Sequence, residues 1–183
     1  STWRRSLSGT EMHQKAKEHQ LIFRPHFKTH QSTEVGKWFR EEGVDKICVS
    51  SVDMAIHFAR SGWKDILIAF PVNLREIDGI NKIAAEVNLS LLVESVESIK
   101  FLNNKLKHHC RFYIKIDTGY HRTGVDASDF KTIEIILKEA SKNQKLEFTG
   151  FLVHAGNTYD AASSKEIAFI HFDSVGKLKM LKE

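Results

Sequence analysis

Six short apolar runs, rich in β-branched and aromatic residues, recur along the chain and predict β-strands. They cover residues 21–28, 46–51, 65–72, 89–95, 111–117 and 146–156. Between them, apolar residues recur every three or four positions, the spacing of one face of an α-helix. Ser32, Ser51 and Ser95 precede three of these helical segments, where a hydroxyl can cap the first turn. This alternation of strands and helices predicts a parallel sheet with helices outside it.

Two α/β folds are compatible with this alternation, an open doubly wound sheet and a (β/α)8 TIM barrel. No Gly-x-Gly-x-x-Gly motif follows any predicted strand, which counts against an open dinucleotide-binding sheet. Polar side chains on one face of the first and fifth runs favour the barrel, because they would line its lumen. A complete barrel needs two more strands. We therefore expect residues 1–183 to form a single incomplete barrel domain that stops after about six βα units, unless the sheet is open.

The first run, residues 21–30, has one apolar and one basic face. Because side chains alternate along a strand, the apolar face would consist of Leu21, Phe23, Pro25 and Phe27. The opposite face would consist of Arg24, His26, Lys28 and His30. We expect this basic face to line a cavity that binds an anionic cofactor. An edge strand with a wetted polar face would give the same pattern.

Lys28 stands where the first strand would end. In barrel enzymes the functional residues come from the carboxyl ends of the strands. A lysine amine at such a position can act as a nucleophile and form a Schiff base with a carbonyl compound. The alternative is a lysine whose side chain only extends to the rim of the barrel.

The fifth run repeats this pattern and then breaks at two glycines. Its polar side chains are Arg111, Tyr113, Lys115 and Asp117. Gly119 and Gly124 then flank a Tyr-His-Arg group, and glycines allow the backbone to approach a ligand closely. Arg122 is therefore placed to contact an oxygen or a ring atom of a bound anion, although an ordinary turn would give the same spacing.

Composition bears on the partners and the cellular setting of the protein, and it leaves the predicted fold unchanged. The chain has 27 Lys and Arg against 23 Asp and Glu, spread along its length, so we expect no nucleic-acid partner. Cys48 and Cys110 show neither metal-ligand nor redox spacing, which favours a reduced, cytoplasmic setting. No apolar run approaches the roughly 20 residues that span a bilayer, so we expect no membrane partner.

Three motifs in this order resemble those of the alanine-racemase-like, fold-type-III pyridoxal-phosphate enzymes. They are the segments 24–30 (RPHFKTH), 115–124 (KIDTGYHRTG) and 154–159 (HAGNTY). The most similar branch is that of D-threonine aldolase and D-serine dehydratase, and the resemblance covers essentially the whole chain. The sequence differs from that branch at Gln31, where a lysine is common, and at Asn157, where a second histidine is often found.

The resemblance implies pyridoxal 5'-phosphate as the cofactor, held by the catalytic Lys28 as a Schiff base. It also implies that Arg122 lies beside the cofactor, His154 near its ring and Tyr159 near its edge or phosphate. The full set of implied cofactor-binding residues is Lys28, His26, Arg122, His154, Tyr159 and Asn157. No metal ligand is assigned in these 183 residues. A divalent metal, Zn or Mn, would be bound by the family's C-terminal β-domain, which this sequence does not contain.

The function that the resemblance implies is a pyridoxal-phosphate-dependent lyase that acts on D-amino acids, of aldolase or dehydratase type. The full-length protein would be a homodimer, and this chain alone would be inactive. Two alternatives stay open: an amino-acid racemase built on the same barrel, and a barrel protein that binds pyridoxal phosphate without catalysis.

Overall fold

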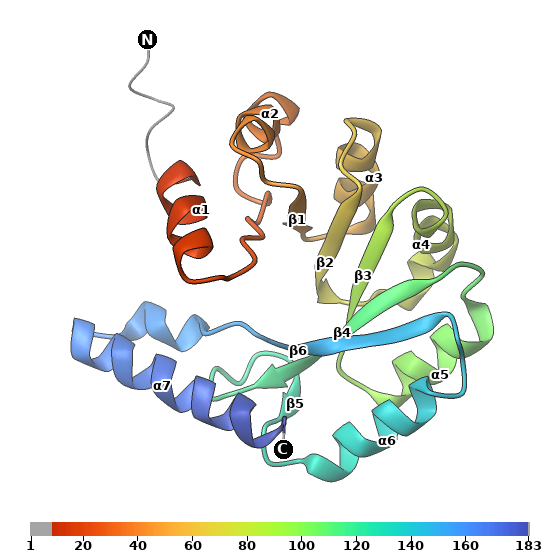
Figure 1. Cartoon of the computed structure of the whole chain (residues 1–183). Helices are drawn as coiled ribbons and strands as arrows, with labels where there is room; N and C mark the ends of the chain where they lie inside the picture. Colours follow the sequence, from red (N-terminus) through yellow and green to blue (C-terminus); the bar gives the residue numbers. More distant parts are fainter. Residues whose placement is uncertain (1–8, 183) are drawn as a thin grey trace. The chain divides into compact units, whose positions relative to one another are not determined.

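The structure, a computed structural model, describes residues 9–182 (Figure 1). The helices are α1 (Gly9–Glu18), α2 (Thr33–Glu41), α3 (Val52–Arg60), α4 (Ile77–Ala84), α5 (Val96–Lys105), α6 (Phe130–Ala140) and α7 (Ser164–Met180). The strands are β1 (Lys46–Val49), β2 (Asp65–Pro71), β3 (Asn88–Val93), β4 (Cys110–Asp117), β5 (Val125–Asp126) and β6 (Leu146–Val153). Two short 3-10 helices, η2 (Leu74–Glu76) and η3 (Gly156–Asp160), complete the secondary structure.

The described chain divides into two compact units. The first contains the residues up to Phe70 together with Asp78–Ser90, and the second contains Pro71–Ile77 and the residues from Leu91 onward. The predicted single domain over residues 1–183 also includes residues 1–8 and 183, which lie outside the described residues.

The strands pair in parallel, as the sequence predicts. In the first unit β1 runs beside β2, with Lys46 opposite Asp65 and Val49 opposite Ile68. In the second unit β4 pairs with β6, from Cys110 opposite Leu146 onward, and also with the short β5. The hydrogen-bonding order of the strands is β1-β2-β3-β4-β5, with β6 paired to β4. The predicted parallel sheet with intervening helices is therefore confirmed.

The helices begin where the sequence indicates. The hydroxyl oxygens of Ser32, Ser51 and Ser95 each accept a hydrogen bond from a backbone N–H three residues later, at the first turns of α2, α3 and α5. These bonds satisfy donors that the first turn of a helix leaves without a partner inside the helix. Among the described helices, none has the length and apolar character needed to cross a membrane.

The core of the first unit is aromatic. Phe27 is fully buried, and its ring lies 5.0 Å from that of Phe58 and 5.2 Å from that of Trp63, centroid to centroid. Gly36 allows α2 to approach this cluster, because a Cβ there would lie 3.2 Å from the Phe27 ring. The apolar residue just before Lys28 is thus fixed by edge-on packing against several rings.

The first predicted strand is present only as a short bridge. His26 forms an isolated parallel bridge with Cys48, in which the Phe27 N–H donates to the Cys48 carbonyl and the Cys48 N–H donates to the Pro25 carbonyl. The chain then turns, and the Gln31 N–H donates back to the Phe27 carbonyl at 3.1 Å. The predicted strand over residues 21–28 is therefore too long. Leu21 is 66% exposed and does not belong to the expected apolar face.

The prediction that His30 shares a face with Lys28 is also wrong. The turn carries His30 back onto the aromatic cluster, and its ring centroid lies 4.4 Å from that of Phe27. Its Nδ1 accepts the Ser32 N–H at 3.1 Å. Burial disfavours the imidazolium and lowers the pKa of His30. His30 is thus a packing residue of the first unit.

One ion pair anchors the segment that carries Lys28. Arg24 Nη2 lies 2.7 Å from Asp65 Oδ1, and both side chains are largely buried, at 13% and 12% exposed. Arg24 Nη1 also donates to the Ile47 carbonyl at 3.2 Å. One guanidinium therefore holds the segment to both β1 and β2.

We expect Arg24→Met to destabilise the protein by about 3 kcal/mol, because it leaves the largely buried Asp65 carboxylate without its cation. Urea unfolding at neutral pH measures this loss. The double variant R24M/D65L should lose less than R24M, since it leaves no lone charge. Lys37→Met, which breaks an ion pair with Glu34 whose side chains are 60% and 69% exposed, is the control and should cost less than about 1 kcal/mol. An R24M loss no larger than that of K37M would contradict the anchoring role.

Candidate functional site

In the first unit, Lys28 lies in the turn that follows the bridge, and its side chain is exposed. Its backbone N–H donates to Nδ1 of His26 at 3.3 Å, and Nε2 of Gln31 donates to its carbonyl at 3.2 Å. Within residues 9–182 the Lys28 amine forms no ion pair. The backbone at Lys28 is thus held by its neighbours, while its amine is available for a ligand.

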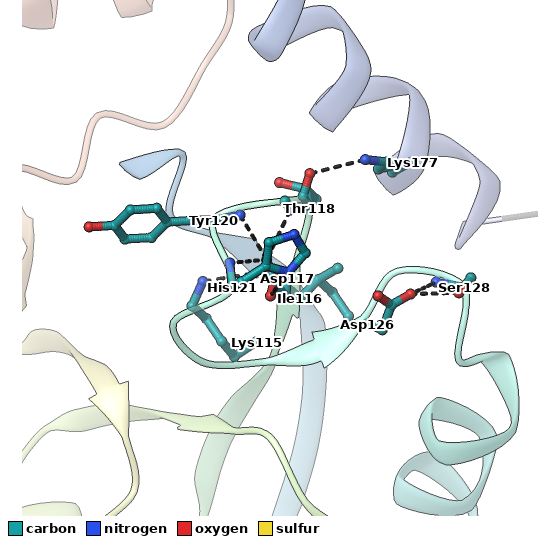
Figure 2. Close-up of polar contacts among 10 residues, drawn as sticks. Lys115, Ile116, Asp117, Thr118, Tyr120, His121, Asp126, Ser128 and Lys177 are labelled. Atoms are coloured by element: carbon teal, nitrogen blue, oxygen red, sulfur yellow. Dashed lines mark hydrogen bonds and ion pairs between the residues drawn. The ribbon is translucent and has the colours of Figure 1, made fainter. Parts of the chain in front are cut away.

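In the second unit, Asp117 organises the loop that leaves β4 (Figure 2). Its Oδ1 accepts the backbone N–H groups of Gly119 at 2.9 Å, Tyr120 at 3.0 Å and His121 at 3.1 Å. Its Oδ2 lies 3.3 Å from Nδ1 of His121. Burial alone would raise the pKa of Asp117, but the three N–H donors and His121 outweigh it and hold this pKa below its usual value.

The same loop is attached to α7. The Thr118 hydroxyl lies 2.9 Å from that of Ser174, and both residues are buried. The Lys177 amine donates to the Thr118 carbonyl at 3.0 Å, a contact drawn in Figure 2. The loop after β4 therefore has fixed contacts on two sides before any ligand binds.

Gly124 closes the base of this loop in a conformation that suits glycine. Its φ is +113°, and a Cβ there would lie 2.9 Å from the Asp117 nitrogen and 3.0 Å from Cγ of Lys115. Gly119, at φ +127°, is also in the left-handed region. Both glycines that the sequence singles out are thus needed by the backbone of the loop itself.

Lys115 is a buried amine that sequence reasoning placed at a strand end without giving it a role. It is 4% exposed, and its Nζ donates to the Ile116 carbonyl at 3.4 Å. Burial lowers the pKa of Lys115, and Arg122 lowers it further, whereas Asp117 and Glu94 act in the opposite direction. Glu94 Oε2 is buried and has no hydrogen-bond partner in the described part of the chain.

The loop after β6 carries three of the predicted residues, His154, Asn157 and Tyr159. The ring of His154 lies 5.8 Å from that of Tyr159, centroid to centroid, and Tyr159 is 72% exposed. Oδ1 of Asn157 is buried and has no hydrogen-bond partner among the described residues. A buried acceptor without a hydrogen bond lowers the stability of the fold unless a ligand or a water molecule donates to it.

The loops after β4 and β6 meet through Tyr120. The Tyr120 ring lies 5.7 Å from that of His154, and the Arg122 guanidinium carbon lies 5.3 Å from the Tyr120 ring centroid. The second unit thus brings Arg122 and His154 to the same tyrosine, whereas Lys28 and His26 belong to the first unit. Sequence reasoning gave Tyr120 no role. The signal for it was its position inside the glycine-flanked group that was already singled out.

Each unit, taken by itself, offers polar groups that suit part of a phosphorylated aldehyde such as pyridoxal phosphate. In the first unit, Lys28 provides an amine without an ionic partner among the described residues, which an aldehyde can engage. Arg122 provides an exposed guanidinium for an anionic oxygen, and Oδ1 of Asn157 provides a buried acceptor for a ring N–H or hydroxyl. Within residues 9–182, no group of three or more His, Cys, Asp or Glu side chains is placed to hold a metal ion.

Comparison with known proteins identifies the family. A family described as "Alanine racemase, N-terminal domain" matches residues 10–179, which is nearly the whole chain. The chain belongs to this family. The prediction of an alanine-racemase-like, fold-type-III barrel domain is thereby confirmed.

Individual relatives are similar to this alanine-racemase-type domain in sequence, and one of those below also in fold. The D-threo-3-hydroxyaspartate dehydratase of Delftia sp. HT23 matches with a TM-score of 0.85 at 25% identity, over 92% of this chain and 45% of that one. D-serine dehydratase of Dictyostelium discoideum is 26% identical over 86% of this chain and 43% of its own length. 3-hydroxy-D-aspartate aldolase of Paracoccus denitrificans is 30% identical over 80% of this chain and 38% of its own length. The chain therefore spans about two fifths of the length of these relatives.

The low pKa of Asp117 predicts how the stability of this alanine-racemase-type domain depends on pH. A carboxylate whose folded pKa lies below its unfolded value stabilises the fold above the unfolded value and loses this effect as the pH falls through the folded value. Asp117→Asn keeps an acceptor oxygen but removes the charge. We expect it to destabilise the protein by about 1 kcal/mol at neutral pH, a figure reduced for solvent screening.

Urea unfolding over a pH series checks this expectation. The difference between wild type and D117N should shrink as the pH falls below 3.8, the ordinary value for aspartate. Glu134→Gln, at an exposed carboxylate of α6, is the control and should show neither effect. A D117N difference that stays constant down to strongly acidic pH would mean that the Asp117 charge does not support the loop.

Proposed function

We propose that this chain is the cofactor-binding barrel domain of a pyridoxal-phosphate-dependent lyase that acts on D-amino acids, of the dehydratase or aldolase type. One observation carries the proposal: the backbone of Lys28 is fixed in a turn, while its amine has no ionic partner among the described residues. The chain also belongs to the alanine-racemase-type family. D-serine dehydratase and 3-hydroxy-D-aspartate aldolase among the relatives support the substrate class. Because the chain covers two fifths of their length, the activity is that of the whole protein.

The residues of this chain have separate tasks in this proposal. Lys28 would hold the cofactor through its aldehyde, and its amine would move a proton to or from the substrate Cα as a general acid or base. His26 fixes the Lys28 backbone through its ring nitrogen. Within the second unit, Arg122, His154, Asn157 and Tyr159 would bind and orient the cofactor. When bound, pyridoxal phosphate supplies an electron sink for the electrons released at Cα.

An amino-acid racemase is the second candidate, because alanine racemases are also among the relatives. In a racemase the proton removed from Cα is replaced on the opposite face. A dehydratase instead breaks the bond between the β-carbon and its hydroxyl group, and an aldolase breaks the Cα–Cβ bond. Product analysis of the whole protein with a β-hydroxy D-amino acid and with D-alanine separates the two.

Further properties of the whole protein are also proposals. A divalent cation, Zn or Mn, would be bound by residues outside this chain and would assist loss of a β-hydroxyl as a Lewis acid. A variant of a D-threo-3-hydroxyaspartate dehydratase has been solved in a metal-free form, which supports a metal in that relative. Homodimer formation and a cytoplasmic setting remain predictions from the sequence.

Borohydride reduction tests the assignment of Lys28. We expect reduction of the protein loaded with pyridoxal phosphate to fix the cofactor on Lys28, as read by peptide mapping, and we expect Lys28→Ala to lose both the label and lyase activity. Lys64→Ala, at an exposed lysine of the same unit, is the control and should retain both. A label on any other lysine would falsify the assignment. A label on Lys28 without turnover of any D-amino acid would favour the non-catalytic binding protein.

A further inference from the structure

Tyr120 is the residue on which the contacts of the second unit converge, and the function proposed above gives it no task. It lies on the loop after β4, whereas its ring rests on Gly156 of the loop after β6. A Cβ on Gly156 would overlap that ring, so the two loops fit together only with glycine at this position. Gly156 is buried, consistent with a ring that covers it.

The backbone of Tyr120 is fixed independently of its ring. Its N–H is one of the three that donate to Oδ1 of Asp117. Figure 2 shows the ring projecting outward from the loop that Asp117 holds. A side chain with a fixed backbone and a ring confined on one face by Gly156 has little rotational freedom left.

The ring contacts two of the residues assigned to the cofactor. The Arg122 guanidinium lies over its face, with 5.3 Å from the guanidinium carbon to the ring centroid. The ring of His154 meets it edge-on, at 5.7 Å between centroids and 71° between planes. Arg122 is otherwise an exposed side chain with many rotamers, so the ring limits where its charge can be.

These contacts all use the aromatic ring of Tyr120. We propose that Tyr120 is a positioning residue: its ring, seated on Gly156, holds Arg122 and His154 where they meet the cofactor. This inference rests on the proposed function. It adds the requirement that the pair Tyr120–Gly156, rather than the tyrosine hydroxyl, sets the affinity for pyridoxal phosphate and the environment of the bound cofactor.

Four variants test the pair by cofactor titration, with the dissociation constant and the visible absorbance band as readouts. Tyr120→Phe keeps the ring and should bind pyridoxal phosphate as wild type does. Tyr120→Leu should weaken binding roughly five- to tenfold and shift the band, because Arg122 and His154 lose their support. Gly156→Ala should have a similar effect, since its methyl group displaces the ring. The double variant Y120L/G156A should bind no more weakly than Y120L, because no ring is left to displace.

Phe148→Leu is the control for a purely structural effect. Phe148 is an aromatic residue of β6 whose ring packs on Phe112 and Phe151. F148L should lower the thermal midpoint while leaving the dissociation constant and the band unchanged. If Y120L likewise lowers only the thermal midpoint and leaves the dissociation constant and the band unchanged, Tyr120 has a packing role only, and the inference is wrong.

The remaining outcomes separate this inference from the function on which it rests. If the wild-type protein binds pyridoxal phosphate at Lys28 and Y120L binds it with the same affinity, the positioning role of Tyr120 is overturned and the proposed function is not. If the losses of cofactor affinity in Y120L and G156A add fully in the double variant, the contact between the Tyr120 ring and Gly156 does not set the affinity. A wild-type protein that never takes up the cofactor overturns both the proposed function and this inference.

Discussion

The site in the second unit depends on a single acceptor, Oδ1 of Asp117. Three consecutive backbone N–H groups point at this one oxygen, and without it the loop would have to find three other acceptors or expose its donors to water. The loop is also narrow at its base, because β5 pairs with the last residues of β4 and places Asp126 beside Asp117. Asp117 therefore converts a glycine-rich segment into a fixed platform for Tyr120 and Arg122.

Lys115 places a positive charge in the interior of the second unit, and its neighbours determine how costly that charge is. A fully buried ammonium is costly, and burial is the largest influence on its pKa. Asp117 and Glu94 offset part of that cost, whereas Arg122 adds to it. A guanidinium that is held out over the Tyr120 ring remains close to solvent, where its charge is screened. The direction in which Arg122 extends thus suits both an anionic ligand and the buried lysine behind it.

The elements that follow from local chemistry could be predicted from the sequence, and those that depend on contacts across the fold could not. Serine caps and apolar periodicity located α2, α3 and α5, and strong apolar runs located β1 to β4 and β6. The strand predicted for the first run was too long. Phe27 is buried among rings that are distant in sequence, and the chain turns directly after it, so the alternation expected of a strand does not continue. The two-residue β5 is too short for any pattern, and α1 has no buried residue to generate one.

The same distinction applies to the candidate site. Lys28 and Arg122 could be singled out because a charged residue at a strand end or between glycines is locally conspicuous. Tyr120 stands inside the same glycine-flanked group, but its role could not be predicted, since that role comes from a glycine 36 positions later in the sequence that lies against its ring. Orphaned atoms such as Oδ1 of Asn157 likewise become visible only once the surrounding residues are folded.

The contact between Tyr120 and Gly156 also constrains how this sequence can vary. A side chain at position 156 is compatible with the observed backbone only if position 120 loses its ring, since both would occupy the same space. Losing the ring in turn frees Arg122 and removes one edge-on partner of His154, whose ring also meets that of Tyr159 edge-on. A single exchange at either position therefore disturbs the other, and a compensated pair of exchanges restores the packing but not the support for the cation. Glycine at 156 is thus required by the neighbouring loop, through the ring of Tyr120.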